Sequence, residues 1–231
     1  MINNVVRHIV VIGFELFLRV YQLMFLKQNV IQKYRVKFDG VEFYLVKNFY
    51  EMAELLIEGR IMPWIFAASF MYILAGNISG YTIKLGSCKF VYIRKEFLDS
   101  SFGTSVIAHE VGHIINRHSY KIFCGKYDGL NFDNLGGEVV VYDFEAQADA
   151  YALKMCGDEE MFYSDKNFKE FEKKNREAII RGIEEYEDMF GEDADLSSCK
   201  NDYIDEEKYE DIFSSLTHQM EIRKNLLPKY L

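Results

Sequence analysis

The sequence is poor in proline and cysteine, and each shortage excludes a class of protein. It has 2 proline and 15 glycine residues among 231, which excludes collagen-like, linker-rich and proline-rich architectures. Its four cysteines lie far apart and form no CxxC pair, so a disulfide scaffold is excluded and we expect reduced thiols in a cytoplasmic protein. These cysteines are Cys88, Cys124, Cys156 and Cys199.

Positive charge is scarce as well. The chain has 27 lysine and arginine residues against 36 aspartate and glutamate residues, for a net charge of -9, so we expect no nucleic-acid partner. The excess of acid lies in residues 158–231, which hold 11 basic and 21 acidic residues, whereas residues 1–157 hold 16 and 15. We interpret the acidic part chiefly as a solvated outer layer of helices.

The first apolar stretch is not a clean hydrophobic run. Residues 5–26 are interrupted by charged residues and lack the small-residue cleavage site of a signal peptide. From Glu15 onward the polar residues recur at steps of four and three, which predicts a helix with one narrow polar stripe. We expect a core or docking helix. Because residues 1–37 hold six basic residues and one acid, a peripheral membrane contact through this helix remains open.

A second apolar stretch carries no charge between Arg60 and Lys84. Its continuous apolar part, residues 61–75, has the length of a buried core helix. A membrane-inserted segment over residues 61–83 is the alternative, so we expect a cytoplasmic protein with membrane association left open.

Local patterns predict an α+β, mainly helical fold with a small antiparallel β-sheet. Alternating residues around Asp39-Gly40 and around Gly86-Ser87 predict hairpins over residues 36–46 and 81–93. Ser100, Ser101 or Thr104 is predicted to cap a helix that continues through His118. Further helices are predicted over residues 49–59, 138–155, 165–190 and 203–226. High aromatic content, with 19 Phe and 16 Tyr, excludes disorder of the whole chain.

One of the predicted helices carries the motif HExxH. Residues four apart share one face of a helix, so His109 and His113 can reach the same metal ion. Glu110 then lies beside a water on that metal and can take its proton. The pattern predicts a hydrolytic zinc site with an open position for water.

A third ligand is expected from the helix over residues 138–155. Glu145 and Asp149 share one face of that helix, so Glu145 can bind the metal while Asp149 hydrogen-bonds a ligand histidine. The small residues Ala146, Ala148, Ala150 and Ala152 indicate close packing of two helices. His118 is five residues beyond His113 and is not preferred, and Asn116 and Ser119 exclude a metzincin.

These motifs resemble the gluzincin metallopeptidases, whose pattern is HExxH followed by ExxxD. Three segments are similar to the branch of CAAX prenyl proteases and HtpX-like peptidases: AHEVGHIINRHS, EAQADAYA and SLTHQMEIRKNL, which begin at residues 108, 145 and 215. The short interval between His113 and Glu145 is nearer to the ImmA/IrrE-type metallopeptidases, which are the second choice.

The resemblance implies Zn2+ on His109, His113 and Glu145, with Glu110 as general base and Asp149 orienting a ligand. It also implies that His218 and Arg223 approach the site and stabilise the tetrahedral intermediate. The expected parts are an N-terminal helix and hairpin region (residues 1–60), a zincin-like catalytic core (61–157) and an acidic helical extension that completes the same domain (158–231).

The function that follows is a zinc-dependent endopeptidase acting on a protein or peptide substrate bound in extended form. In such enzymes an edge strand before the active helix pairs with substrate, and we expect residues 89–93 to be that strand. Two alternatives remain: a non-catalytic zinc module whose fourth ligand would be Cys124 or Cys156, and a regulatory ImmA/IrrE-like protease that cleaves a single partner.

Overall fold

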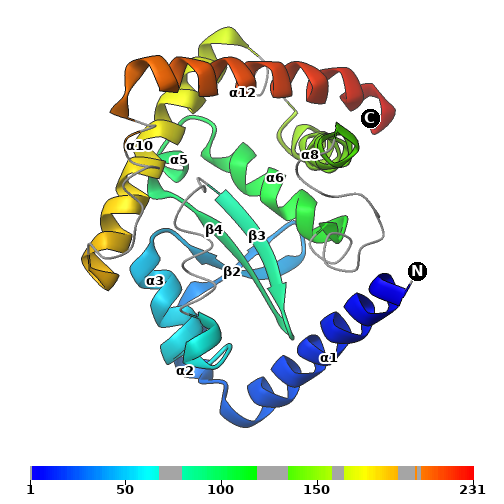
Figure 1. The fold of residues 1–231 in the computed structure, drawn as a ribbon, viewed down its shortest axis with the longest axis vertical. Coiled ribbons are helices and arrows are strands. Elements are labelled where there is room, and N and C mark those ends of the chain that lie inside the picture. The colour runs from blue at the N-terminus through cyan, green and yellow to red at the C-terminus, as the bar shows by residue number, and fades with distance from the viewer. Residues whose placement is uncertain (1, 68–79, 119–134, 158–163, 192–200, 202–203) are drawn as a thin grey trace.

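A computed structural model describes residues 2–67, 80–118, 135–157, 164–191, 201 and 204–231. It has the predicted α+β, mainly helical composition, with a single four-stranded sheet among the described residues. In Figure 1 the helices surround this sheet, with α12 across the top and α1 along the lower right. In the part of the chain that is described, no helix is both long enough and apolar enough to cross a membrane.

The sheet is built from two hairpins. Strands β1 (Arg35–Phe38) and β2 (Val41–Val46) form the first, and β3 (Gly80–Leu85) and β4 (Cys88–Ile93) form the second. Both were predicted, and both pairs are antiparallel. The first turn fits its residues, since Asp39 and Gly40 have φ of 44° and 77°, the left-handed pair that a tight hairpin requires.

The prediction of a purely antiparallel sheet is wrong at its centre. The strand order is β1-β2-β4-β3, and β2 pairs with β4 in parallel, with Tyr44 opposite Phe90. Parallel neighbours need a long crossover. Part of that crossover is helix α3 (Phe49–Ala53) and the single π-helical turn at Glu54–Glu58.

Residues 89–93 were expected to form an edge strand, and this is also wrong. Strand β4 pairs on both sides, and Phe90, Val91, Tyr92 and Ile93 are all buried. A nearly continuous apolar strand is typical of an interior position covered on both faces. Among the described strands, the one at the end of the sheet on this side is β3.

Helix α6 (Gly103–Ile115) carries the HExxH motif and contacts β3 and β4. The predicted serine or threonine cap is wrong, because the N-cap residue is Phe102 and no side chain caps the helix. The helix also ends at Ile115 rather than at His118. Arg117 has φ of 56°, a left-handed conformation that terminates a helix.

The remaining helices follow the predicted pattern closely. Helix α8 spans Leu135–Cys156 and is followed by Gly157 at φ of 73°. Helix α10 spans Asp165–Phe190, and α12 spans Glu206–Leu226, where Asp205 accepts hydrogen bonds from two backbone amides at the N-terminus. The short helices are α2 (Gln28–Ile31) and α5 (Lys95–Leu98), and helix α1 spans Ile2–Phe25.

Helix α10 is part of the core, in contrast to the solvated layer that its acidity suggested. Ile179, Ile183 and Tyr186 lie in one hydrophobic cluster with Phe90 and Tyr92 of the sheet. Ala178 lies in a second cluster that includes residues of β4 and α6. The division of the chain at residues 60 and 157 stays a prediction.

The second apolar stretch is described only over its first seven residues. Ile61, Met62 and Ala67 are buried, as expected of a core segment, whereas Trp64 and Phe66 are exposed. The rest of the predicted helix, residues 68–75, lies outside the described residues.

Candidate metal centre

Helices α6 and α8 approach each other closely at Gly112. A Cβ atom added there would lie 2.9 Å from Cα of Ala148, so only glycine allows this separation. Ala146, Ala148 and Ala152 are fully buried. The close packing predicted from the small residues of α8 is therefore present, and it places the two motif-bearing helix faces side by side.

Three side chains from these helices converge on one point. Nε2 of His113 lies 3.0 Å from Nε2 of His109, and the Glu145 carboxylate oxygens lie 3.1 Å from His109 Nε2 and 3.4 Å from His113 Nε2. His109, His113 and Glu145 are the group of described residues whose donor atoms could hold a metal ion.

The three separations suit a small tetrahedral ion. With metal–ligand distances of about 2.0–2.1 Å, tetrahedral ligands lie about 3.3 Å apart, the size of the observed triangle. Two imidazole nitrogens and one carboxylate are a common donor set for catalytic zinc. The residues therefore fit zinc, and a fourth position is left to a non-protein ligand as far as the described residues show.

Asp149 connects the triad to the C-terminal helix. Its Oδ1 lies 2.8 Å from Nδ1 of His109. Arg223 of α12 donates two hydrogen bonds to it, from Nε to Oδ2 (2.9 Å) and from one terminal nitrogen to Oδ1 (2.7 Å), and that nitrogen is 3.8 Å from Glu145. Although burial opposes it, the nearby Arg223 guanidinium and His109 hold the pKa of Asp149 at about 2. Asp149 is therefore an anion that can orient His109.

The same carboxylates act on His109 itself. Burial lowers its pKa, but the hydrogen bonds and negative charges of Asp149 and Glu145 outweigh burial and raise the pKa to about 10. Surroundings that favour a proton on this imidazole also favour a metal cation in its place.

Glu110 lies on the side of α6 that faces β3. Its side chain is buried, and the Thr82 hydroxyl donates to Oε2 at 2.5 Å, while the Glu110 backbone carbonyl oxygen lies 3.1 Å from the same hydroxyl. A Cβ atom added to Gly80 would lie 2.9 Å from Oε1. Strand β3 therefore comes directly against the carboxylate that the motif assigns as a base.

A chain of polar contacts leads away from His113 on the other side. Nδ1 of His113 lies 2.7 Å from Nδ1 of His118, whose Nε2 lies 3.2 Å from Oε1 of Gln147. The Gln147 amide donates to Asp143 at 3.0 Å, and Asp143 also accepts hydrogen bonds from Lys229 and Tyr230. His118 is buried and stacked on the Phe144 ring, with centroids 4.4 Å apart.

The sequence did not predict that Thr82 contacts Glu110 or that His118 contacts His113. The signal for Thr82 was weak, since one threonine in an alternating strand is unremarkable. His118 was set aside as a ligand because of its spacing from His113. It reaches His113 because α6 ends at Ile115 and the chain turns at Arg117.

The other predicted residues lie apart from this group. His218 is exposed on α12, and no contact described for it reaches the triad, so its role stays a prediction. Cys156 is partly exposed at the end of α8 and is not in the metal-binding group, whereas Cys124 lies outside the described residues.

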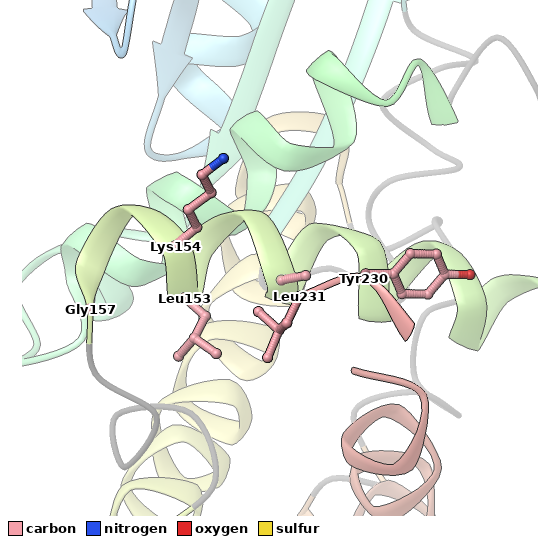
Figure 2. A pocket seen from close by; sticks show the side chains of 6 residues that line it. Leu153, Lys154, Gly157, Tyr230 and Leu231 are labelled. Carbon is pink, nitrogen blue, oxygen red and sulfur yellow. The ribbon is translucent and has the colours of Figure 1, made fainter. Parts of the chain in front are cut away.

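A separate pocket lies where α8 ends, and no metal-site residue lines it. Figure 2 shows Tyr230 and Leu231 of the C-terminal segment near Leu153, with Lys154 extending away from them. Its lining mixes apolar side chains with one lysine, and it contains no cluster of catalytic groups.

Comparison with known proteins finds no matching family model, no matching curated protein and no matching solved structure. The likeness to gluzincins therefore rests on the motifs and on the geometry that joins them.

Proposed function

We propose that this protein is a zinc-dependent endopeptidase. The observation that carries the proposal is the convergence of His109, His113 and Glu145, with a buried glutamate, Glu110, next to the first ligand on the same helix. A non-protein fourth ligand and an adjacent base are what separates a hydrolytic zinc site from a structural one.

Zinc bound there would polarise the scissile carbonyl and acidify a water molecule. The protein's own part is to hold its ligands in one tautomer. Imidazoles that bind through Nε2 carry hydrogen on Nδ1, so His109 donates to Asp149 and His113 donates to His118. His118 then donates from Nε2 to Gln147, whose amide donates to Asp143. Every contact in this series, from Asp149 through the two ligand histidines to Asp143, has one donor and one acceptor, apart from the contact between the two ligand nitrogens, where the metal would lie. This arrangement supports the proposal.

Glu110 is assigned as the proton shuttle. Its Oε2 is fixed by the Thr82 hydroxyl, which leaves Oε1 to accept a proton from the attacking water and return it to the leaving amine. Arg223 is assigned as a positioning residue, because it donates two hydrogen bonds to Asp149, which in turn contacts His109.

The substrate in this proposal is an extended peptide aligned along β3. That strand lies at the end of the sheet order and carries Gly80 and Thr82 against Glu110. A strand at the end of a sheet can bind an extended peptide through its backbone, with little dependence on the peptide's sequence.

A non-catalytic zinc module is the second candidate. It would be favoured by a closed site with four protein ligands, whereas the described residues offer three. A regulatory protease of the ImmA/IrrE kind would use the same chemistry on a single partner.

The test combines metal analysis with cleavage of a proteome-derived peptide library by the full chain. We expect one zinc per chain in the wild type and in Glu110→Gln, with turnover lower in the variant by about 10²–10⁴-fold. Cleavage by Glu110→Gln at the wild-type rate would refute the assigned base. Bound zinc with no cleavage by the wild type would favour the non-catalytic module.

A further inference from the structure

Helix α1 turns its polar stripe toward the protein. Gln22 is buried, and its amide donates 3.0 Å hydrogen bonds to the carbonyls of Ile61 and Leu85, while its Oε1 accepts from the backbone and hydroxyl of Ser87. Leu18 is buried beside it, and the Glu15 carboxylate lies 3.8 Å from Lys84. The polar side of this amphipathic helix is thus the side that packs against the rest of the protein.

The opposite side of α1 is apolar and exposed. At 100° per residue, those of residues 9–25 that lie within about 60° of the direction opposite Leu18 are all hydrophobic, apart from Gly13. Leu23 is 86% exposed and Leu16 is 62% exposed. The exposed apolar residues on this side are Ile9, Ile12, Leu16, Val20, Leu23 and Met24. A water-soluble helix normally shows the reverse arrangement.

The segment after Pro63 packs against the flank of α1, between Leu18 and the exposed apolar side. The Phe66 ring lies 5.7 Å from Phe14 and 6.3 Å from Phe17 of α1, measured between centroids. Trp64, the sole tryptophan of the chain, is 70% exposed two residues away. Tryptophan is favoured where an apolar phase meets water, because its ring is apolar and its N–H is polar.

The charge of the residues near α1 indicates which kind of partner covers its exposed apolar side. Residues 1–37 hold six basic residues and one acid, although the whole chain has a net charge of -9. Lys33 and Arg35 pair with Glu54 and Glu42, and with these two acids included the basic residues are still in excess. The acidic helices α10 and α12 lie away from α1 in Figure 1. A second copy of the chain would bring two basic ends together, whereas an anionic lipid surface offers both opposite charge and an apolar phase.

We propose that α1 and Trp64 form a peripheral attachment site for anionic membranes, with α1 lying in the plane of the interface. The outward leucine, isoleucine and valine side chains enter the acyl boundary, and nearby basic residues contact lipid phosphates. This attachment is independent of the metal centre and stands whether or not the protein is a peptidase.

The test uses the full chain with vesicles of phosphatidylcholine, with and without phosphatidylglycerol. We expect cosedimentation with the anionic vesicles, weakened by added salt, and a shift of Trp64 emission to shorter wavelength. The variant L16E/L23E should lose affinity by about tenfold or more. Ile204→Glu places one such negative charge on an exposed isoleucine elsewhere and should bind as the wild type does.

Two results would overturn the proposal. One is wild-type binding to anionic vesicles that L16E/L23E leaves unchanged. The other is failure to bind any vesicle, in which case sedimentation velocity at several concentrations decides the occupant: self-association that L16E/L23E abolishes would assign the surface to a second copy. Circular dichroism of L16E/L23E confirms that α1 and the fold persist.

Discussion

Two buried arginine–carboxylate pairs in this molecule differ in the groups that they contact. Arg94, at the end of β4, donates a 2.6 Å hydrogen bond to Glu185 of α10. Arg223 of α12 donates hydrogen bonds of 2.9 and 2.7 Å to Asp149 of α8. Both pairs join elements far apart in the sequence, and in each a partner is almost fully buried.

The contacts beyond each pair make the difference. Glu185 also accepts from the backbone N–H of Phe49, and the Arg94 guanidinium lies over the rings of Phe49 and Tyr92, so this chain of contacts ends on backbone and aromatic rings. Asp149 instead continues to His109, which faces Glu145 and His113. Burial of charge therefore does not distinguish the two pairs; the difference is that only the Arg223–Asp149 pair contacts, among the described residues, a group of side chains that could hold a metal ion.

The largest effect is expected from a substitution in the group formed by His109, His113 and Glu145. Glu145→Ala removes one of the three proposed ligands, and we expect zinc affinity to fall by about a thousandfold, near 4 kcal/mol. Competition with a chromophoric chelator measures it. Glu184→Ala, an exposed glutamate on α10, is the matched control. Unchanged zinc affinity in Glu145→Ala would show that Glu145 is not the third ligand.

The next largest effect is expected from breaking the Arg94–Glu185 pair. Arg94→Met leaves Glu185 without its cation and should lower the free energy of unfolding by about 3 kcal/mol, while zinc stoichiometry stays the same. The double variant Arg94→Met/Glu185→Gln leaves no unpaired charge and keeps an acceptor for Phe49, so most of the loss should be recovered. Urea denaturation compares the variants, and a double variant no more stable than the single one would contradict a purely structural pair.

Arg223→Met tests whether the second pair positions a ligand. Loss of a group that holds a ligand's partner lowers metal affinity by about 10–100-fold. Arg223→Lys should recover this only in part, since lysine cannot donate from two fixed nitrogens to one carboxylate. Lys224→Met, at the exposed neighbouring position, is the control. A loss of stability without any change in zinc affinity would make Arg223 a structural residue like Arg94.

The smallest effect concerns a buried carboxylate whose described partner is a tyrosine. Glu172 accepts a hydrogen bond from the Tyr209 hydroxyl, and burial raises its pKa to about 7 although that hydrogen bond lowers it. A raised acid pKa means that the folded state binds the proton more tightly than the unfolded state. Its contribution to stability is therefore complete below the usual value of 4.5 and is lost as pH rises through about 7.

Glu172→Gln should remove this pH dependence. At pH 8 the variant should be more stable than the wild type by about 1–2 kcal/mol, and the gain should vanish near pH 4. Thermal denaturation across this range measures it, with Glu184→Gln as the exposed control on the same helix. An equal effect at both pH values would show that Glu172 does not titrate in this window.

Local chemistry made much of the fold and site predictable. Asp39-Gly40 specifies its turn, Gly157 ends α8, and the four-residue spacing of His109 and His113 places both on one face of α6. Each of these depends on neighbours within one turn of the chain, which the sequence displays directly.

Long-range pairing was not predictable in the same way. The apolar sequence of β4 is compatible with an interior strand, but it does not specify the partner, because β2 pairs with it in parallel from more than forty residues away in the sequence. Thr82 meets Glu110, and His118 meets His113, only after β3 packs on α6 and the chain turns at Arg117. The target of Arg223 likewise depends on how α12 docks.

The parallel pairing of β2 with β4 forms the seam between the two hairpins. This seam has a consequence for the order of folding. Each hairpin closes a short loop and can form within microseconds, whereas aligning Tyr44 with Phe90 must close a much longer one. We therefore expect the rate-limiting barrier to lie at the docking of one hairpin on the other. Because both turns are already formed at that barrier, substitutions that weaken a turn should mainly slow refolding with little effect on unfolding, and those in the seam should affect both rates.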